Sequence, residues 1–125
     1  HDSNDIGASI ASGSFRTDGM LIAPCSIKTL SAVANCYAED LIARAADVCL
    51  KEGRPLLLMV RETPLHPGHL HLMQLASQAG AILFPPVPSF YDKPQSLDEM
   101  VTATVGRALQ RMGIDNDVYR IWHGL

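Results

Sequence analysis

Two short polar segments of this 125-residue chain combine residue types that can bind an anion and move a proton. In Pro24–Thr29, small and hydroxylated residues stand at the start of a helix, so backbone N–H groups, a hydroxyl and the Lys28 ammonium can hold a phosphate or the polar edge of a flavin. The alternative, which this segment favours when it is taken alone, is a helix cap beside a solvated lysine. Arg61 and Glu62 form the second segment, in which a guanidinium can grip phosphate and a carboxylate can move a proton. Its alternative is a local ion pair on the surface.

Three apolar runs are expected to position these segments, namely Met20–Ala23, Leu56–Val60 and Ala81–Phe84. Each run stops at a polar or proline-rich segment, as expected for buried strands of a parallel sheet. The carboxyl ends of parallel strands lie at one edge of the sheet, where open α/β sheets bind ligands. Because Arg61 and Glu62 directly follow the middle run, we favour a functional role for this pair over a surface ion pair.

Helical patterns and capping signals separate the apolar runs. The sequence predicts helices over Thr29–Ala38 with a cap near Ser26, over Leu41–Glu52, over Gly68–Ala79, and over Leu97–Met112 with a capping box formed by Ser96 and Glu99. The order of strands and helices predicts an α/β fold, with a Rossmann-like (flavodoxin-like) three-layer parallel sheet and right-handed crossovers. We predict a single domain over residues 1–125.

The composition narrows the classes of function. A hydrophobic content of 47% with 18% charged residues fits one globular domain with a core, and the net charge of −3 argues against a nucleic-acid partner. No apolar run approaches the ~18 residues of a membrane span. Cys25, Cys36 and Cys49 match no zinc pattern or disulfide framework, which favours reduced thiols and a cytoplasmic location.

Several other residues have two interpretations. Arg44 and Lys51 lie seven residues apart on one helix face, with Asp47 one turn from each, so they form either a salt-bridged surface or a cationic stripe beside a cleft or subunit contact. Three histidines, His66, His69 and His71, are interpreted as surface residues rather than metal ligands, since their side chains do not converge. Three more candidates are weak individually: Tyr91, Arg107 and Trp122.

Taken together, the segments resemble the UbiX/Pad family of flavin prenyltransferases, formerly described as carboxy-lyases or phenylacrylic acid decarboxylases. The resemblance extends along nearly the whole chain and is carried by Ala11–Phe15, Pro24–Leu30, Arg44–Val48, Leu50–Glu52, Val60–Leu65, Pro85–Pro88, Phe90–Tyr91 and Arg107. The family's N-terminal Gly-rich FMN loop has no counterpart here, so we expect that an N-terminal unit is missing.

The resemblance implies roles for individual residues. FMN would contact Ser26, Ile27, Lys28, Thr29 and Arg61. The phosphate of dimethylallyl phosphate would lie among Arg44, Lys51, Arg61, Tyr91 and Arg107. The catalytic residues would be Arg61, Glu62, Tyr91 and Trp122, with Glu62 assisting proton transfer and Trp122 closing the site from a neighbouring subunit. No metal is expected, because fixed cations can stabilise a departing phosphate.

The activity that the resemblance implies is transfer of a dimethylallyl group to N5 and C6 of reduced FMN. The product, prenylated FMN, would serve UbiD-type decarboxylases in ubiquinone biosynthesis or aromatic acid decarboxylation, and the enzyme would be a dodecamer-like homo-oligomer. Two alternatives stay open. One is a non-catalytic FMN-binding or assembly subunit, and the other is a flavoprotein cysteine decarboxylase, which carries Pro-Ala-Ser-Ala-Asn-Thr where this chain has Pro24–Thr29.

Overall fold

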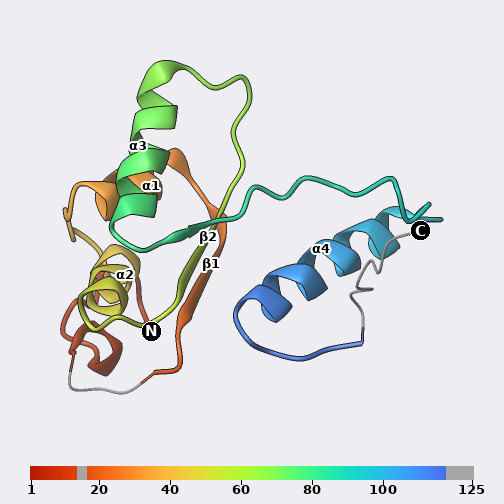
Figure 1. Cartoon of the computed structure of the whole chain (residues 1–125). Helices are drawn as coiled ribbons and strands as arrows, with labels where there is room; N and C mark the ends of the chain where they lie inside the picture. The colour runs from red at the N-terminus through yellow and green to blue at the C-terminus, as the bar shows by residue number, and fades with distance from the viewer. Residues whose placement is uncertain (14–16, 118–125) are drawn as a thin grey trace. The chain divides into compact units, whose positions relative to one another are not determined.

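The computed structural model describes residues 1–13 and 17–117. The chain divides into two units, residues 1–85 and 86–125, each with its own internal contacts (Figure 1). The sheet and three α-helices belong to the first unit, and one long helix belongs to the second. The single domain over residues 1–125 stays a prediction.

The first unit is built on three parallel strands in the order β1-β2-β3. The strands are β1 (Met20–Cys25), β2 (Leu56–Val60) and β3 (Ile82–Leu83). β2 has the predicted bounds, while β3 is two residues shorter than predicted. β1 continues through Pro24 to Cys25, beyond its predicted end, with a register shift between Ile22 and Cys25. Proline has no N–H to donate to the neighbouring strand, which accounts for an irregular ladder at this point.

Helices cover one face of this sheet. They are α1 (Ile27–Ala34), α2 (Leu41–Lys51) and α3 (Pro67–Gln78), and a short 3₁₀ turn, η1 (Ser9–Ala11), packs against α2. Because the strand order follows the chain order, right-handed crossovers place all three α-helices on the same face, and Figure 1 shows them together there. The parallel α/β fold is therefore confirmed, and residues 1–85 supply two of the three expected layers.

The core of the first unit lies between the sheet and these helices. Leu56, Leu58 and Val60 of β2 point into it and are buried, together with Leu30 of α1 and Ala76 of α3. Leu57, which alternates to the opposite face of β2, is buried as well. β2 is therefore covered on both faces, as its unbroken apolar sequence predicts for a central strand.

The second unit contains α4 (Leu97–Arg111), which follows a proline-rich segment. The Ser96 hydroxyl accepts from the Glu99 N–H at 3.1 Å, which is half of the predicted capping box. The other half is wrong, because the Glu99 carboxylate accepts from the N–H of Gln95 at 3.1 Å instead of that of Ser96. Among the residues described, no helix combines the length and the apolar character needed to cross a membrane.

Candidate functional site

The two polar segments singled out from the sequence leave the sheet side by side. Cys25, the last residue of β1, is the register partner of Val60, the last residue of β2. Neighbouring strands lie about 4.8 Å apart, so Ser26 and Arg61 begin their segments from adjacent points of the same edge. The prediction that these segments meet at the carboxyl edge of the sheet is confirmed.

Ser26 caps α1 and leaves two backbone donors at this edge. Its hydroxyl oxygen accepts from the Thr29 N–H at 3.1 Å, and the two hydroxyl oxygens lie 3.2 Å apart. The N–H groups of Ile27 and Lys28 belong to the first turn and have no partner within the helix. The cap interpretation is thus correct, and it coexists with a helix terminus that can bind a carbonyl or an anion.

Arg61 and Glu62 do not form the surface ion pair that was their alternative interpretation. Both residues are exposed, and within the described parts of the chain neither side chain is in a salt bridge. Glu62 instead accepts a hydrogen bond from the Thr63 N–H through Oε1, at 3.1 Å. The guanidinium and the second carboxylate oxygen, Oε2, are therefore accessible to a ligand at the edge of the sheet.

Cys25 lies directly beneath this edge but is not suited to nucleophilic chemistry. Its side chain is only 1% exposed, and burial raises its pKa from 9.0 to about 11. The Sγ atom lies 3.6 Å from the carbonyl oxygen of Ser26. A thiol that stays protonated at neutral pH is inert, so Cys25 acts as a core residue that supports the Ser26 turn.

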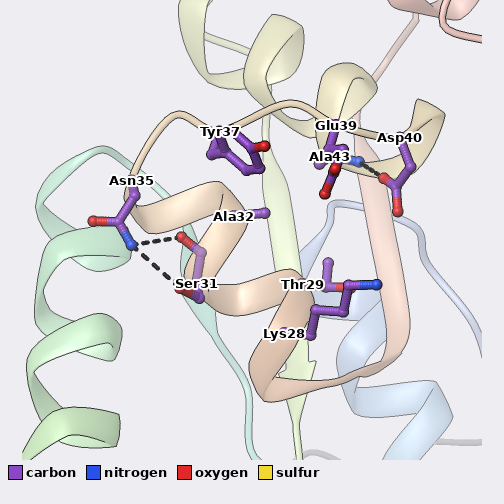
Figure 2. Close-up of a pocket in the computed structure, with 9 residues that line it drawn as sticks. All are labelled: Lys28, Thr29, Ser31, Ala32, Asn35, Tyr37, Glu39, Asp40 and Ala43. Atoms are coloured by element: carbon purple, nitrogen blue, oxygen red, sulfur yellow. Dashed lines mark hydrogen bonds between the residues drawn. The ribbon is translucent and has the colours of Figure 1, made fainter.

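A cavity of about 510 Å³ opens beside α1 (Figure 2). It is lined by Lys28, Thr29, Ser31, Ala32, Asn35, Tyr37, Glu39, Asp40 and Ala43. Lys28 and Thr29 lie at one end, and Tyr37 and Glu39, from the loop between α1 and α2, lie at the other (Figure 2). Its volume is in the range of small-molecule sites. The cavity therefore begins at the first turn of α1, beside the carboxyl edge of the sheet, and continues away from the strands to the loop after α1.

Most of the residues that line this cavity were missed from the sequence. The helix was predicted to run to Ala38, but α1 ends at Ala34, and Cys36 adopts a positive φ of 55°. Because α1 ends early, Tyr37 and Glu39 lie in a loop. The only signal in the sequence was an aromatic residue, Tyr37, followed closely by two carboxylates, Glu39 and Asp40.

The cations on α2 behave as a salt-bridged surface. Arg44 Nη1 lies 3.4 Å from Asp47 Oδ2, and Lys51 Nζ lies 3.9 Å from Glu52 Oε1. Lys51 ends α2, a few residues before β2 begins, and therefore lies toward the amino edge of the sheet. Arg61 leaves the opposite end of β2, so one copy of the chain does not bring Lys51 and Arg61 together.

The remaining predicted site residues lie beyond the first unit. Tyr91 is exposed in a loop, and Arg107 is half-buried on α4. Both belong to the second unit, residues 86–125. Trp122 lies outside the described residues. Convergence of these side chains on one phosphate stays a prediction.

The histidines have a role that the sequence interpretation missed. His66 is the N-cap of α3, and its ring stacks on that of His69 with the centroids 3.6 Å apart. His66 and His69 are therefore capping residues, while His66 and His71 are also exposed, in line with their interpretation as surface histidines. In the part of the chain that the structure describes, no three His, Cys, Asp or Glu side chains lie close enough to hold a metal ion.

Comparison with known proteins identifies close relatives. The chain matches the protein family described as Flavoprotein over residues 1–107. It is 58% identical to the flavin prenyltransferase UbiX of Thauera aromatica over 99% of this chain and 64% of that protein. It is 56% identical to the UbiX protein of Escherichia coli K12, over 99% of this chain and 67% of that protein. The chain thus spans about two thirds of the length of these relatives.

Solved structures give the same result. A structure of AnUbiX (PadA1) in complex with FMN and dimethylallyl pyrophosphate superposes with a TM-score of 0.97 at 47% identity, covering 100% of this chain and 66% of that one. A dodecameric FMN-dependent UbiX-like decarboxylase from Escherichia coli O157:H7 superposes with a TM-score of 0.95 at 47% identity, covering 99% of this chain and 67% of that one.

Proposed function

This chain belongs to the flavoprotein family, in its UbiX flavin prenyltransferase branch, and from that premise we propose that it transfers a dimethylallyl group from dimethylallyl phosphate to reduced FMN. The observation that carries the proposal is the TM-score of 0.97 to a protein solved with FMN and dimethylallyl pyrophosphate. The allylic C–O bond breaks, phosphate leaves, and a bond forms to N5 of the flavin, which loses its proton. The alkene then takes up a proton and bonds to C6, which loses its own proton.

The residues at the carboxyl edge fit a flavin phosphate or carbonyl. The first turn of α1 offers the N–H groups of Ile27 and Lys28, the Lys28 ammonium adds a positive charge, and Arg61 emerges beside them. A guanidinium binds a carbonyl or phosphate through two parallel hydrogen bonds. We assign Ser26–Thr29 and Arg61 to FMN, with Ser26 holding the turn rather than donating to the ligand.

FMN, when it is bound, supplies the nucleophilic atoms, and the protein supplies charge and a proton carrier. Arg61 and Arg107 are assigned to the departing phosphate, because fixed positive charges stabilise it without a metal, and the Tyr91 hydroxyl is assigned to it as a hydrogen-bond donor. Glu62 is assigned to proton transfer through Oε2, since Oε1 is held by the Thr63 N–H. We propose that Arg44, Lys51 and Trp122 contribute to the site at a contact between subunits.

The product would be prenylated FMN, and its user a UbiD-type decarboxylase in ubiquinone biosynthesis or aromatic acid decarboxylation. Two observations support a homo-oligomer: the dodecameric relative and the exposed apolar residues of α4. We also propose a cytoplasmic location, which is supported by the free thiols of Cys25, Cys36 and Cys49.

The direct test mixes the protein with reduced FMN and dimethylallyl phosphate under anaerobic conditions. We expect a new flavin absorption spectrum and release of one phosphate per flavin. A parallel reaction with dimethylallyl pyrophosphate distinguishes the two donors, because only the accepted donor yields a prenylated flavin. Adding a chelator should leave the rate unchanged.

The same experiment separates the alternatives. A non-catalytic FMN-binding or assembly subunit would retain FMN without changing its spectrum or releasing phosphate. A flavoprotein cysteine decarboxylase would also leave the flavin unprenylated and release no phosphate, and in a separate incubation it would release carbon dioxide from a cysteine substrate. Either outcome, in protein that retains FMN, would contradict the prenyltransferase proposal.

A further inference from the structure

The junction between β2 and α3 is held by two histidines in a reciprocal arrangement. The Gly68 N–H donates to Nδ1 of His66 at 2.9 Å, and the His66 N–H donates to Nδ1 of His69 at 3.4 Å. Both rings therefore act as acceptors through Nδ1. An imidazole accepts through Nδ1 only when it is neutral and carries its proton on Nε2.

Gly68 makes room for this arrangement. A Cβ atom at position 68 would lie 2.6 Å from Cε1 and 3.0 Å from Nδ1 of His66. A side chain there would displace the imidazole from its capping position. The close approach of ring and backbone that this hydrogen bond requires is therefore possible because position 68 has no side chain.

Residues 61–66, the segment that ends at this capping box, contain two of the candidate site residues. Arg61 and Glu62 are five and four positions from His66, and every residue from 61 to 66 is exposed. Val60 is buried at one end of the segment, and the capping box holds the other. Since side-chain packing contributes little in between, the two ends determine the path of this backbone.

Protonation is incompatible with both caps. A proton on Nδ1 turns the acceptor into a donor that faces a backbone N–H. It also places positive charge at a helix N-terminus, where the helix dipole opposes it. Two charged rings with centroids 3.6 Å apart would repel each other as well.

Few other charges lie on the neighbouring elements. α1, which packs against α3, carries only Lys28, and β3 carries none. Within α3 the one other titratable residue is the exposed His71, and the preceding segment contributes Arg61 and Glu62. Among the described residues, neither His66 nor His69 is paired with a carboxylate that would stabilise its charged form.

We propose that His66 and His69 form a proton-sensitive capping box that positions the Arg61–Glu62 segment only while both rings are neutral. Protonation of these rings then releases the start of α3 and loosens the segment. His66 and His69 are positioning residues, which act on the site through the backbone. The consequence for catalysis rests on the proposed function, whereas the structural switch does not.

The test follows the amides of His66 and Gly68 by NMR in the whole chain between pH 8 and pH 5. After correction for the intrinsic pH dependence of exchange, we expect both amides to lose protection together, by roughly fivefold, as expected for loss of an N-cap. His66→Asn caps a helix without titrating and should keep Gly68 protected throughout. The matched control, His71→Asn, should titrate like the unmodified chain.

Two results would overturn the switch: constant protection of Gly68 down to pH 5, or an unchanged titration in His66→Asn. Gly68→Ala gives a further check, because displacement of the His66 ring should lower protection of the amide at position 68 already at pH 8. In the prenyltransferase assay, kcat should fall with acidification in the unmodified chain and less in His66→Asn. If the chain proves inactive, the amide measurements still decide the proposal.

Discussion

Glu62 combines exposure, a fixed position and one occupied oxygen. Its Oε1 accepts from the Thr63 N–H, which orients the carboxylate at the carboxyl edge of the sheet. Glu62→Gln keeps an oxygen for that hydrogen bond but cannot take up a proton at neutral pH. We expect FMN retention to be unchanged and turnover to fall by about 100-fold or more, measured as prenylated flavin formed per minute.

The control for this variant is Asp5→Asn, which removes an exposed carboxylate from an N-terminal loop that has no assigned role in the site. It should leave turnover unaffected. A fully active Glu62→Gln protein would show that the carboxylate has no acid–base role.

Arg107 tests the prediction of a shared phosphate site. Arg107→Ala should weaken use of dimethylallyl phosphate by roughly 2 kcal/mol, as expected for a charge-assisted contact, while FMN retention stays the same. The measurement is kcat/KM for the prenyl donor. Arg111→Ala, on the last turn of the same helix, is the matched control. Equal effects of both variants would indicate that Arg107 acts only through the general charge of α4.

Cys25 predicts an alkaline loss of stability. Its pKa is raised by burial from 9.0 in the unfolded chain to about 11 in the folded one. The folded state holds the proton more tightly, so this contribution is complete below pH 9 and is lost as the pH rises through 11. The free energy of unfolding should fall by up to about 1.4 kcal/mol per pH unit in that window on account of this thiol.

Denaturant titrations of Cys25→Ala and Cys36→Ala at several pH values measure this contribution. Cys25→Ala should show a shallower alkaline slope, whereas Cys36→Ala, which changes an exposed thiol, should keep it. Identical slopes in the two variants and in the unmodified protein would show that Cys25 is not the group responsible.

At the scale of secondary-structure elements, Ser26 has a capping role that can be separated from ligand binding. Ser26→Ala should destabilise the protein by about 1 kcal/mol, because the Thr29 N–H loses its acceptor. Ser26→Asp restores the acceptor and should recover that stability. Its added negative charge at the start of α1 should nevertheless weaken FMN binding.

Chemical denaturation and FMN titration of the two variants distinguish these effects. In Ser26→Asp, the free energy of unfolding should return to that of the unmodified protein, whereas FMN affinity should fall. If FMN affinity in Ser26→Asp equals that of the unmodified protein, the start of α1 is not an anion-binding terminus.

At the scale of the whole molecule, α4 points to self-association. Leu97, Val101 and Val105 repeat every four residues and are 78%, 61% and 45% exposed in the single chain. Such a stripe on one helix face is typical of a protein contact. We expect a homo-oligomer by light scattering, and Val101→Asp should lower its mass.

Thr102→Asp places the same charge on a neighbouring position of α4 outside the stripe and should leave the mass unchanged. A monomeric unmodified chain, or an oligomer that tolerates Val101→Asp, would contradict the assignment of this stripe to a contact between copies.

Local sequence determined the elements and the two polar segments of this protein. The unbroken apolar run of β2, the cap at Ser26 and the start of α4 after Ser96 were all predicted, because burial of a central strand and N-capping depend on neighbouring residues. The edge position of Arg61 and Glu62 followed from the parallel order of the strands, which short-range connectivity rules constrain strongly.

Only the tertiary structure decided which of these residues meet. The Cys25–Val60 register brings Ser26 beside Arg61, whereas the direction of α2 takes Lys51 to the opposite edge. It also decided that α1 ends early to form the cavity beside Tyr37, and that His66 caps α3 through Nδ1 while its ring stacks on His69. Sequence spacing cannot supply these results, because register and crossover direction are set by packing between elements distant in the chain, and ring placement depends on the three-dimensional path of the backbone.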